Sequence, residues 1–131
     1  MKESKLLKVV LFISGLIGVV VGGAILVDPV SFYASNGIEL GGNISLLNEV
    51  RAPGGALLGC GLLVMAGAFS SSLTFTSTVL ATLVYLSYGL ARVVSIIADG
   101  MPADILVQVT VLEVVVGLIC AFALVKYRTA S

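Results

Sequence analysis

Residues 9–27 read VVLFISGLIGVVVGGAILV, a run without a single charged side chain. An α-helix rises about 1.5 Å per residue, so this run is long enough to cross a bilayer core of about 30 Å. Lys2, Lys5 and Lys8 precede it, as basic residues do in a secretory signal peptide. Signal peptides, however, have shorter apolar regions and end at a small-residue cleavage site, which the sequence ILVDP lacks. The run therefore predicts a transmembrane helix.

The rest of the chain contains three further apolar stretches of comparable length, residues 52–69, 74–98 and 105–125. Pro53 is expected in the first turn of its helix, where a missing N–H costs nothing. The triplet SSS (70–72) and the turn sequence DGMPAD (99–104) are short connections. They predict that the second and third helices, and likewise the third and fourth, are antiparallel neighbours. Residues 28–48 form a longer outer loop in which we expect a short helix along the membrane surface. We predict a single all-α domain over 1–131, an integral membrane four-helix bundle of up-down-up-down topology.

The composition agrees with a lipid environment. Hydrophobic residues make up 59% of the 131-residue chain and charged residues 11%, and the mean hydropathy is +1.18. Soluble domains have roughly 25% charged residues. The formal net charge of zero argues against a nucleic-acid partner. The chain has no histidine, so we expect neither a metal site nor a cofactor, and Cys60 and Cys120 are interpreted as buried free thiols.

The distribution of charge predicts the orientation in the membrane. With four spans both termini lie on one side, and this side collects five basic residues: Lys2, Lys5, Lys8, Lys126 and Arg128. The opposite side collects mainly acidic residues: Asp28, Glu39, Glu49, Asp99 and Asp104. Because basic residues favour the cytoplasmic side, both termini should be cytoplasmic.

Glycines are regularly spaced in the first two spans. Gly18 and Gly22 share one helical face, and so do Gly55 and Gly59. Small residues at this spacing allow helices to approach closely in lipid. The pattern indicates either packing of the first span on the second or an interface between copies in a homo-oligomer.

Charged residues inside the apolar stretches point to a candidate site. Five residues at helical spacing place one polar face on the third span: Tyr85, Tyr88, Arg92, Ser95 and Asp99. Glu113 lies at similar depth in the fourth span. Ionisable groups in a membrane usually face the bundle interior and pair with one another. We therefore predict an Arg92–Glu113 pair in the outer half of the bundle, with Arg51, Asp99 and Glu49 completing a network.

The predicted pair has two interpretations, and the residues favour neither clearly. As a structural pair it would fix the register of the third helix on the fourth. As a site, a carboxylate beside a guanidinium and two tyrosines would bind a polar head group or relay a proton.

Three segments together resemble a known family: NEVRAPGGALLGCGLL (48–63), ARVVSIIADGMPAD (91–104) and LEVVVGL (112–118). They are similar to the small bacterial membrane proteins of the domain of unknown function 4345 family. The resemblance implies a four-helix protein of the bacterial inner membrane and supplies no activity. It covers roughly residues 7–125. By position it selects nine residues: Asn48, Glu49, Arg51, Gly54, Gly55, Arg92, Asp99, Gly100 and Glu113.

Three functional hypotheses follow. The leading one is a non-enzymatic accessory subunit or lipid- or ligand-binding protein, whose partners are membrane lipid and a homo-oligomer or larger membrane complex. The alternative is a small oligomeric transporter or proton-coupled carrier that uses Glu113 and Arg92. A lipid-modifying enzyme would need Glu113 as general base, assisted by Tyr85 or Tyr88, and the lack of histidine and of an obvious nucleophile weighs against it.

Overall fold

The computed structural model describes residues 1–128, and within them the protein has five helices and no strand. The helices are α1 (Lys5–Val27), α2 (Pro29–Ser35), α3 (Ile44–Phe69), α4 (Thr74–Asp99) and α5 (Asp104–Tyr127). All of them except α2 are long and apolar enough to cross a membrane. The predictions of an all-α chain and of four long apolar helices are confirmed.

One residue, Asp28, ends the first long helix and begins the short one. Its backbone N–H donates to Ala24 O at 3.0 Å and so closes the last turn of α1. Its carboxylate Oδ1 accepts from Ser31 N at 3.1 Å, and Pro29 occupies the first turn of α2. A carboxylate cap followed by proline is a strong helix start, so the chain turns sharply between the two helices.

The connection between the first two long helices is shorter than the predicted range 28–48. Residues 29–35 form α2, and α3 begins at Ile44 because the side chain of Asn43 accepts a hydrogen bond from Leu46 N at 3.1 Å. Asn43 is thus the cap of this helix. Pro53 lies inside α3 rather than in its first turn, which corrects the prediction from the sequence.

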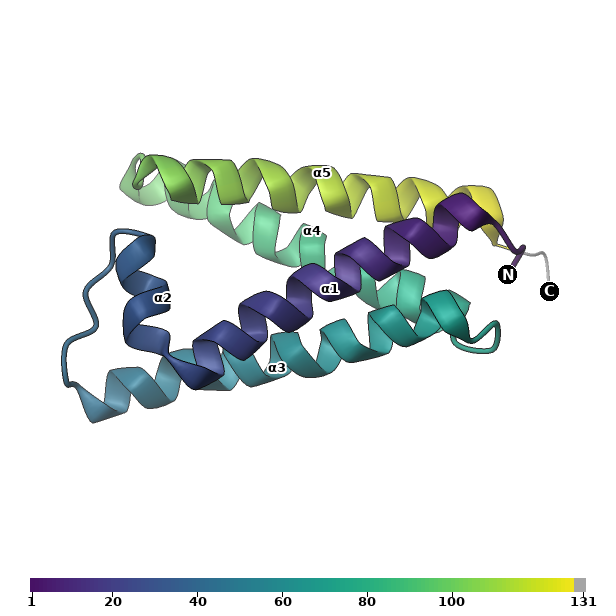
Figure 1. Cartoon of the computed structure of the whole chain (residues 1–131). Coiled ribbons are helices and arrows are strands. Elements are labelled where there is room, and N and C mark those ends of the chain that lie inside the picture. The colour runs from purple at the N-terminus through teal and green to yellow at the C-terminus, as the bar shows by residue number, and fades with distance from the viewer. Residues whose placement is uncertain (129–131) are drawn as a thin grey trace.

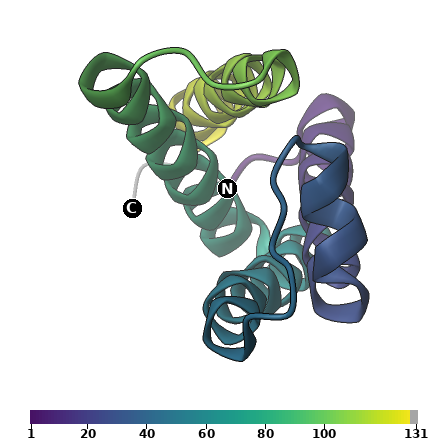
Figure 2. The same cartoon turned by 90° about the vertical axis from the view of Figure 1, so that its left-hand side faces the viewer.

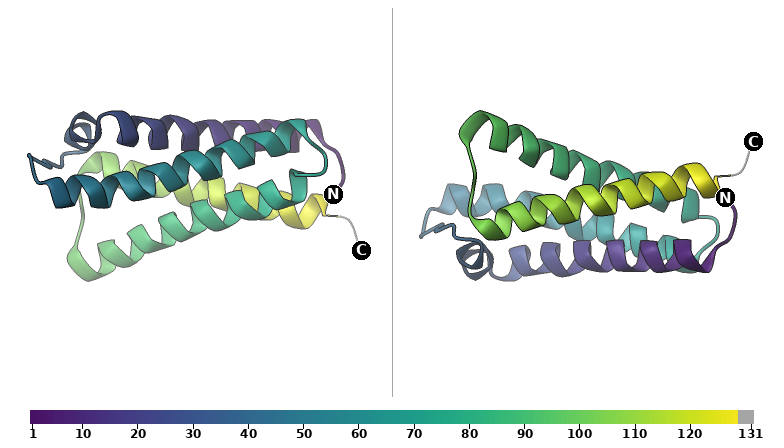
Figure 3. Two further views of the ribbon diagram at one scale, coloured as in Figure 1. Left: turned by 90° about the horizontal axis from the view of Figure 1, so that it is seen from below. Right: turned by 90° about the horizontal axis from the view of Figure 1, so that it is seen from above.

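The four long helices form two pairs. α1 packs mainly against α3 and α4 mainly against α5, with fewer contacts between the pairs. The pairs converge at the end where the chain starts and diverge towards the end where α2 lies (Figures 1 and 3). Figure 2 looks onto the divergent end and shows α2 beside α1.

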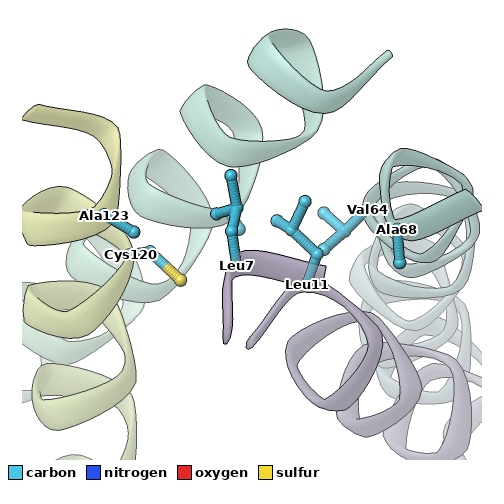
Figure 4. Packing of buried hydrophobic residues seen from close by; sticks show 7 residues of the cluster. Leu7, Leu11, Val64, Ala68, Cys120 and Ala123 are labelled. Atoms are coloured by element: carbon cyan, nitrogen blue, oxygen red, sulfur yellow. The ribbon is translucent and has the colours of Figure 1, made fainter. Parts of the chain in front are cut away.

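A buried cluster holds the convergent end together. Leu7 and Leu11 of α1 lie between Cys120 and Ala123 of α5 on one side and α3 on the other (Figure 4). Leu11 and Cys120 are completely buried. The N–H of Lys2 donates to Tyr127 O at 2.7 Å, which joins the chain start to the end of α5.

Glycines bring α1 and α3 into backbone contact. A Cβ atom added to Gly22 would lie 2.5 Å from Gly54 O, and one added to Gly61 would lie 2.7 Å from Val19 N. Real Cβ atoms do not approach backbone atoms so closely. Only glycine fits here, and the close approach is the kind that stabilises helix pairs in lipid.

Packing of the first span on the second uses one predicted pair of glycines, and an interface between copies stays the other predicted use of the pattern. Gly18 and Gly22 lie against α3 as predicted. On α3, however, the contact uses Gly54 and Gly61, whereas a Cβ added to Gly59 would meet no atom within 4 Å. Gly55 lies only at the edge, 3.9 Å from Leu26 Cδ2 as measured from an added Cβ. Gly54 and Gly61 are seven residues, or about two turns, apart and so share one face of α3, which Gly59 does not.

Candidate ligand-binding cavity

A cavity of about 440 Å³ lies between the two helix pairs, and residues from all five helices line it. Its wall is mostly aliphatic. The lining residues that bring hydrogen-bonding side chains from the divergent half are Tyr33, Asn36, Tyr88, Arg92 and Glu113. Ligand sites in proteins have volumes of about 300–1,000 Å³ and combine an apolar wall with a few polar groups. By size and lining, this cavity is a candidate binding site.

Arg92 of α4 and Glu113 of α5 meet in the cavity wall. Arg92 Nε donates to Glu113 Oε1, forming the one ion pair within residues 1–128. The side chain of Glu113 is 11% exposed and that of Arg92 is 36% exposed. The side chain of Glu113 is therefore more enclosed than that of Arg92.

Two glycines explain why these side chains reach each other. A Cβ added to Gly89 would lie 3.1 Å from Val114 N, and one added to Gly117 would lie 3.0 Å from Leu86 N. The backbones of α4 and α5 thus touch one turn from Arg92 and one turn from Glu113. At this separation the short glutamate side chain spans the gap.

The two predicted tyrosines have different roles. Tyr85 is buried, and its hydroxyl donates to Ser14 O at 2.6 Å, which links α4 to α1 at the deep end of the cavity. Ser14 Oγ in turn lies 3.7 Å from Cys120 Sγ of α5. Tyr88 is half-buried and lines the cavity without a hydrogen bond to any other residue in the described range 1–128. Tyr85 therefore ties α4 to α1, and Tyr88 is a cavity-lining residue without a hydrogen-bond partner in residues 1–128.

The remaining members of the predicted network do not join the ion pair. Arg51 is exposed, and its Nε donates to Leu26 O at 3.2 Å. Glu49 and Asp99 are exposed at the divergent end. α3 belongs to the other helix pair, and the pairs separate at this end, so its charged residues lie apart from those of α4 and α5.

Sequence reasoning placed no site residue in α2, yet this helix contributes to the wall. Phe32 and Tyr33 line the cavity and pack edge to face with ring centroids 5.5 Å apart. Beyond them, a Cβ added to Gly37 would lie 3.5 Å from Ala103 Cβ, in the α4–α5 turn. The segment thus extends from one helix pair to the other across the divergent end. The one feature of the sequence that could have indicated this role is the adjacent aromatic pair, Phe32 and Tyr33, in an otherwise polar connection.

Arg92 also borders a second, smaller hollow of about 100 Å³ near the α4–α5 turn. Ser95, Pro102 and Thr110 line it together with Arg92. Arg92 therefore borders both the main cavity and this hollow.

The cavity offers hydrogen bonds to a ligand next to the Arg92–Glu113 pair, whose two charges neutralise each other. A guanidinium has five N–H donors, of which Arg92 uses one on Glu113. In the part of the chain that the structure describes, no group of three or more Cys, Asp or Glu side chains could hold a metal ion. The arrangement is suited to holding a polar group at Arg92 with apolar material around it.

Comparison with known families gives one match. The model described as domain of unknown function (DUF4345) matches residues 6–124, nearly the whole chain, and confirms the resemblance of the three segments. No curated protein and no solved structure matches the chain.

Proposed function

The chain belongs to the domain of unknown function (DUF4345) family, and we propose that it is a non-enzymatic membrane protein that binds one amphipathic small molecule. The molecule occupies the cavity between the two helix pairs, with its polar end at Arg92 and Glu113 and its apolar part against the aliphatic wall. This is a binding role, as a carrier or an accessory subunit of a membrane complex.

One observation supports the proposal above the others: the only ion pair in residues 1–128 lines a cavity that is otherwise mostly apolar. A pair that only fixed helix register would be stabilised by close packing on every side. Instead, Arg92 is 36% exposed and borders two hollows. Placing an Arg side chain in a membrane segment is costly, and such residues commonly mark a ligand or ion pathway.

The proposed location is the bacterial inner membrane, with both termini in the cytoplasm and the four long helices as one up-down-up-down bundle over residues 1–131. The basic residues Lys2, Lys5, Lys8 and Lys126 are close to the convergent end, which supports this orientation. The divergent end, with α2 and the cavity, then lies in the outer half of the membrane.

Native mass spectrometry of protein extracted gently from its own membrane tests the binding role. We expect a bound mass on the wild type that is lost from the folded double variant Arg92→Leu with Glu113→Leu. A matched control, Glu49→Leu with Arg51→Leu, changes the same residue types outside the cavity and should retain the bound mass. Identical spectra for the wild type and the Arg92/Glu113 double variant would reject the site in favour of a structural pair.

A transport function is the second candidate, and the position of Arg92 between the cavity and the smaller hollow supports it. A charged group that borders two compartments can exchange partners between them. This function predicts pH-dependent flux in proteoliposomes that disappears in Glu113→Gln. Flux that the substitution leaves unchanged would exclude a role of Glu113 in transport.

A further inference from the structure

We infer that the polar end of the bound molecule has no net charge and presents a hydrogen-bond acceptor, such as a carbonyl oxygen, to the guanidinium of Arg92. The inference rests on the proposed binding function and names the chemical class of its ligand. It excludes fatty acids and other anionic amphiphiles, which a lone arginine in an apolar cavity would otherwise favour.

The first argument is the charge balance of the wall. Among residues 1–128, Arg92 is the only basic residue that lines the cavity, and Glu113 is the only acidic one. They are in direct contact, so the charges cancel before any ligand binds. An anion or a cation would bring an uncompensated charge into an apolar space, which is strongly unfavourable.

The second argument is the position of the carboxylate. An anionic head group on the free amino groups of Arg92 would share one guanidinium with the Glu113 carboxylate, whose side chain is 11% exposed. Two negative charges held close together in an apolar space repel each other strongly. A neutral group binds without disturbing the pair.

The third argument is the kind of hydrogen-bonding group that remains accessible. Arg92 uses Nε on Glu113, and its terminal amino groups make no hydrogen bond elsewhere in residues 1–128. Tyr88 also lines the cavity and makes no hydrogen bond within residues 1–128, whereas the hydroxyl group of Tyr85 donates to Ser14 O. A guanidinium can only donate, whereas a tyrosine hydroxyl can donate or accept, so a ligand acceptor is the complement of the free amino groups of Arg92.

The size of the cavity limits the apolar part. A volume of about 440 Å³ is in the lower part of the range for small-molecule sites and holds a single chain or ring system rather than a two-chain phospholipid. An acyl ester and an alkylated quinone share the required chemistry, an apolar body next to a neutral carbonyl group.

The rate at which the Cys60 thiol is labelled can measure ligand binding. Cys60 lines the cavity and is partly exposed, whereas Cys120 is 0% exposed. A small thiol reagent such as methyl methanethiosulfonate should therefore add one label, at Cys60, and a ligand in the cavity should slow the reaction. Cys60→Ala, which should take up no label, is the control for the position.

The experiment compares probes with the same hydrocarbon chain and different end groups. Methyl oleate is a neutral acceptor, oleate an anion and oleylamine a cation, and each is added to protein freed of bound lipid, at neutral pH. We expect methyl oleate to protect Cys60 at a concentration at least about tenfold lower than either charged probe. A benzoquinone with one alkyl chain forms a further arm, and its protection relative to methyl oleate distinguishes a ring ketone from an ester.

Two outcomes distinguish a failure of this inference from a failure of the proposed binding function. Protection by oleate at the same or a lower concentration than methyl oleate would overturn the neutral class and leave the binding function standing. Absence of protection and of bound mass with every probe would reject the binding function itself. The variant Arg92→Lys, which keeps the positive charge but has fewer donors, should weaken protection by methyl oleate if the guanidinium donates to it.

Discussion

At the scale of single residues, Arg92 and Glu113 differ in how much of each side chain the protein encloses. Glu113 is 11% exposed, and Arg92 is 36% exposed. Arginine keeps its charge at any accessible pH, so removing the carboxylate leaves a permanent charge in the wall of an apolar cavity. The partial exposure limits this cost without abolishing it.

The first prediction follows from this pairing. Glu113→Leu should lower the free energy of unfolding by about 3 kcal/mol, the lower end of the range for breaking a buried pair. The double variant Arg92→Leu with Glu113→Leu should cost less than Glu113→Leu alone, because no unpaired charge remains. Unfolding in mixed detergent micelles, followed by circular dichroism, measures both. Additive costs of the two single substitutions would show that the residues do not interact.

The second prediction concerns the tyrosine at the deep end of the cavity. Tyr85→Phe removes the hydroxyl that donates to Ser14 O and should cost about 0.5–1.5 kcal/mol in the same unfolding assay. Tyr88→Phe removes a hydroxyl without a partner in the described chain and is the matched control. It should leave the stability nearly unchanged and weaken ligand binding. Equal stability losses would contradict the division of roles between the two tyrosines.

At the scale of elements, α1 and α3 depend on glycines at their crossing. A Cβ at Gly61 would lie 2.7 Å from Val19 N and 2.8 Å from Gly15 O, both of them backbone atoms that cannot move without shifting α1. Gly59 is on the same helix and has open space around it. The two positions therefore form a natural comparison.

The third prediction uses this comparison. Gly61→Ala should destabilise the protein by about 1–3 kcal/mol, because an added methyl group overpacks the contact. Gly59→Ala should be neutral or slightly stabilising, since alanine is the better helix former. Thermal unfolding of the two variants in one detergent gives the answer. A neutral Gly61→Ala would mean that α1 and α3 are less closely packed at this point.

The short helix α2 depends on a single capping residue. Hydrogen bonds from Ser31, those of its side chain first and its backbone second, hold the pKa of Asp28 below the ordinary value of 3.8. A lowered pKa means that the ionised carboxylate stabilises the folded segment. That contribution is complete above pH 3.8 and is lost as the pH falls through the lower folded pKa.

The fourth prediction is an acid-induced loosening of α2. Amide hydrogen exchange in residues 29–35, corrected for the intrinsic rate, should increase below pH 3.8, while α1 stays protected. Asp28→Asn keeps a capping oxygen without a titrating group, so its exchange should not depend on pH in this range. The same pH dependence in Asp28→Asn would assign the loosening to another group.

At the scale of the whole molecule, the two helix pairs converge at one end and diverge at the other (Figure 1). The buried cluster around Leu7, Leu11 and Cys120 closes the convergent end. At the divergent end the segment that contains α2 reaches the α4–α5 turn, where a Cβ added to Gly37 would lie 3.5 Å from Ala103 Cβ. A cavity at one end of the molecule is the direct result of this shape.

The fifth prediction concerns orientation in the membrane. Alkaline phosphatase inserted into the turn at 100–103 should be active, because the divergent end faces the periplasm in the proposed topology. The same enzyme inserted at 70–72 or fused after Tyr127 should be inactive. Green fluorescent protein at the same three positions should give the opposite pattern. Activity at 70–72 would invert the proposed topology.

The candidate site was predicted in part. The spacing of Tyr85, Tyr88 and Arg92 on one helix, and an isolated Glu113 on another, identified the charged residues that line the cavity. The predicted additions Arg51, Asp99 and Glu49 do not reach the pair, because depth along a helix was estimated without the angle between the helices. α2 was expected only as a helix in a loop, since nothing local specifies what its aromatic side chains contact.

What the sequence determined by itself is the set of long apolar helices and the residues whose charge requires a partner. These follow from local composition: an uncharged run of this length must form its backbone hydrogen bonds within a helix. Which glycines meet at the α1–α3 crossing, how far the pairs diverge, and the cavity that results were decided by the tertiary structure alone. Crossing angles depend on side chains packed from both helices at once, and no single segment of the chain contains that information.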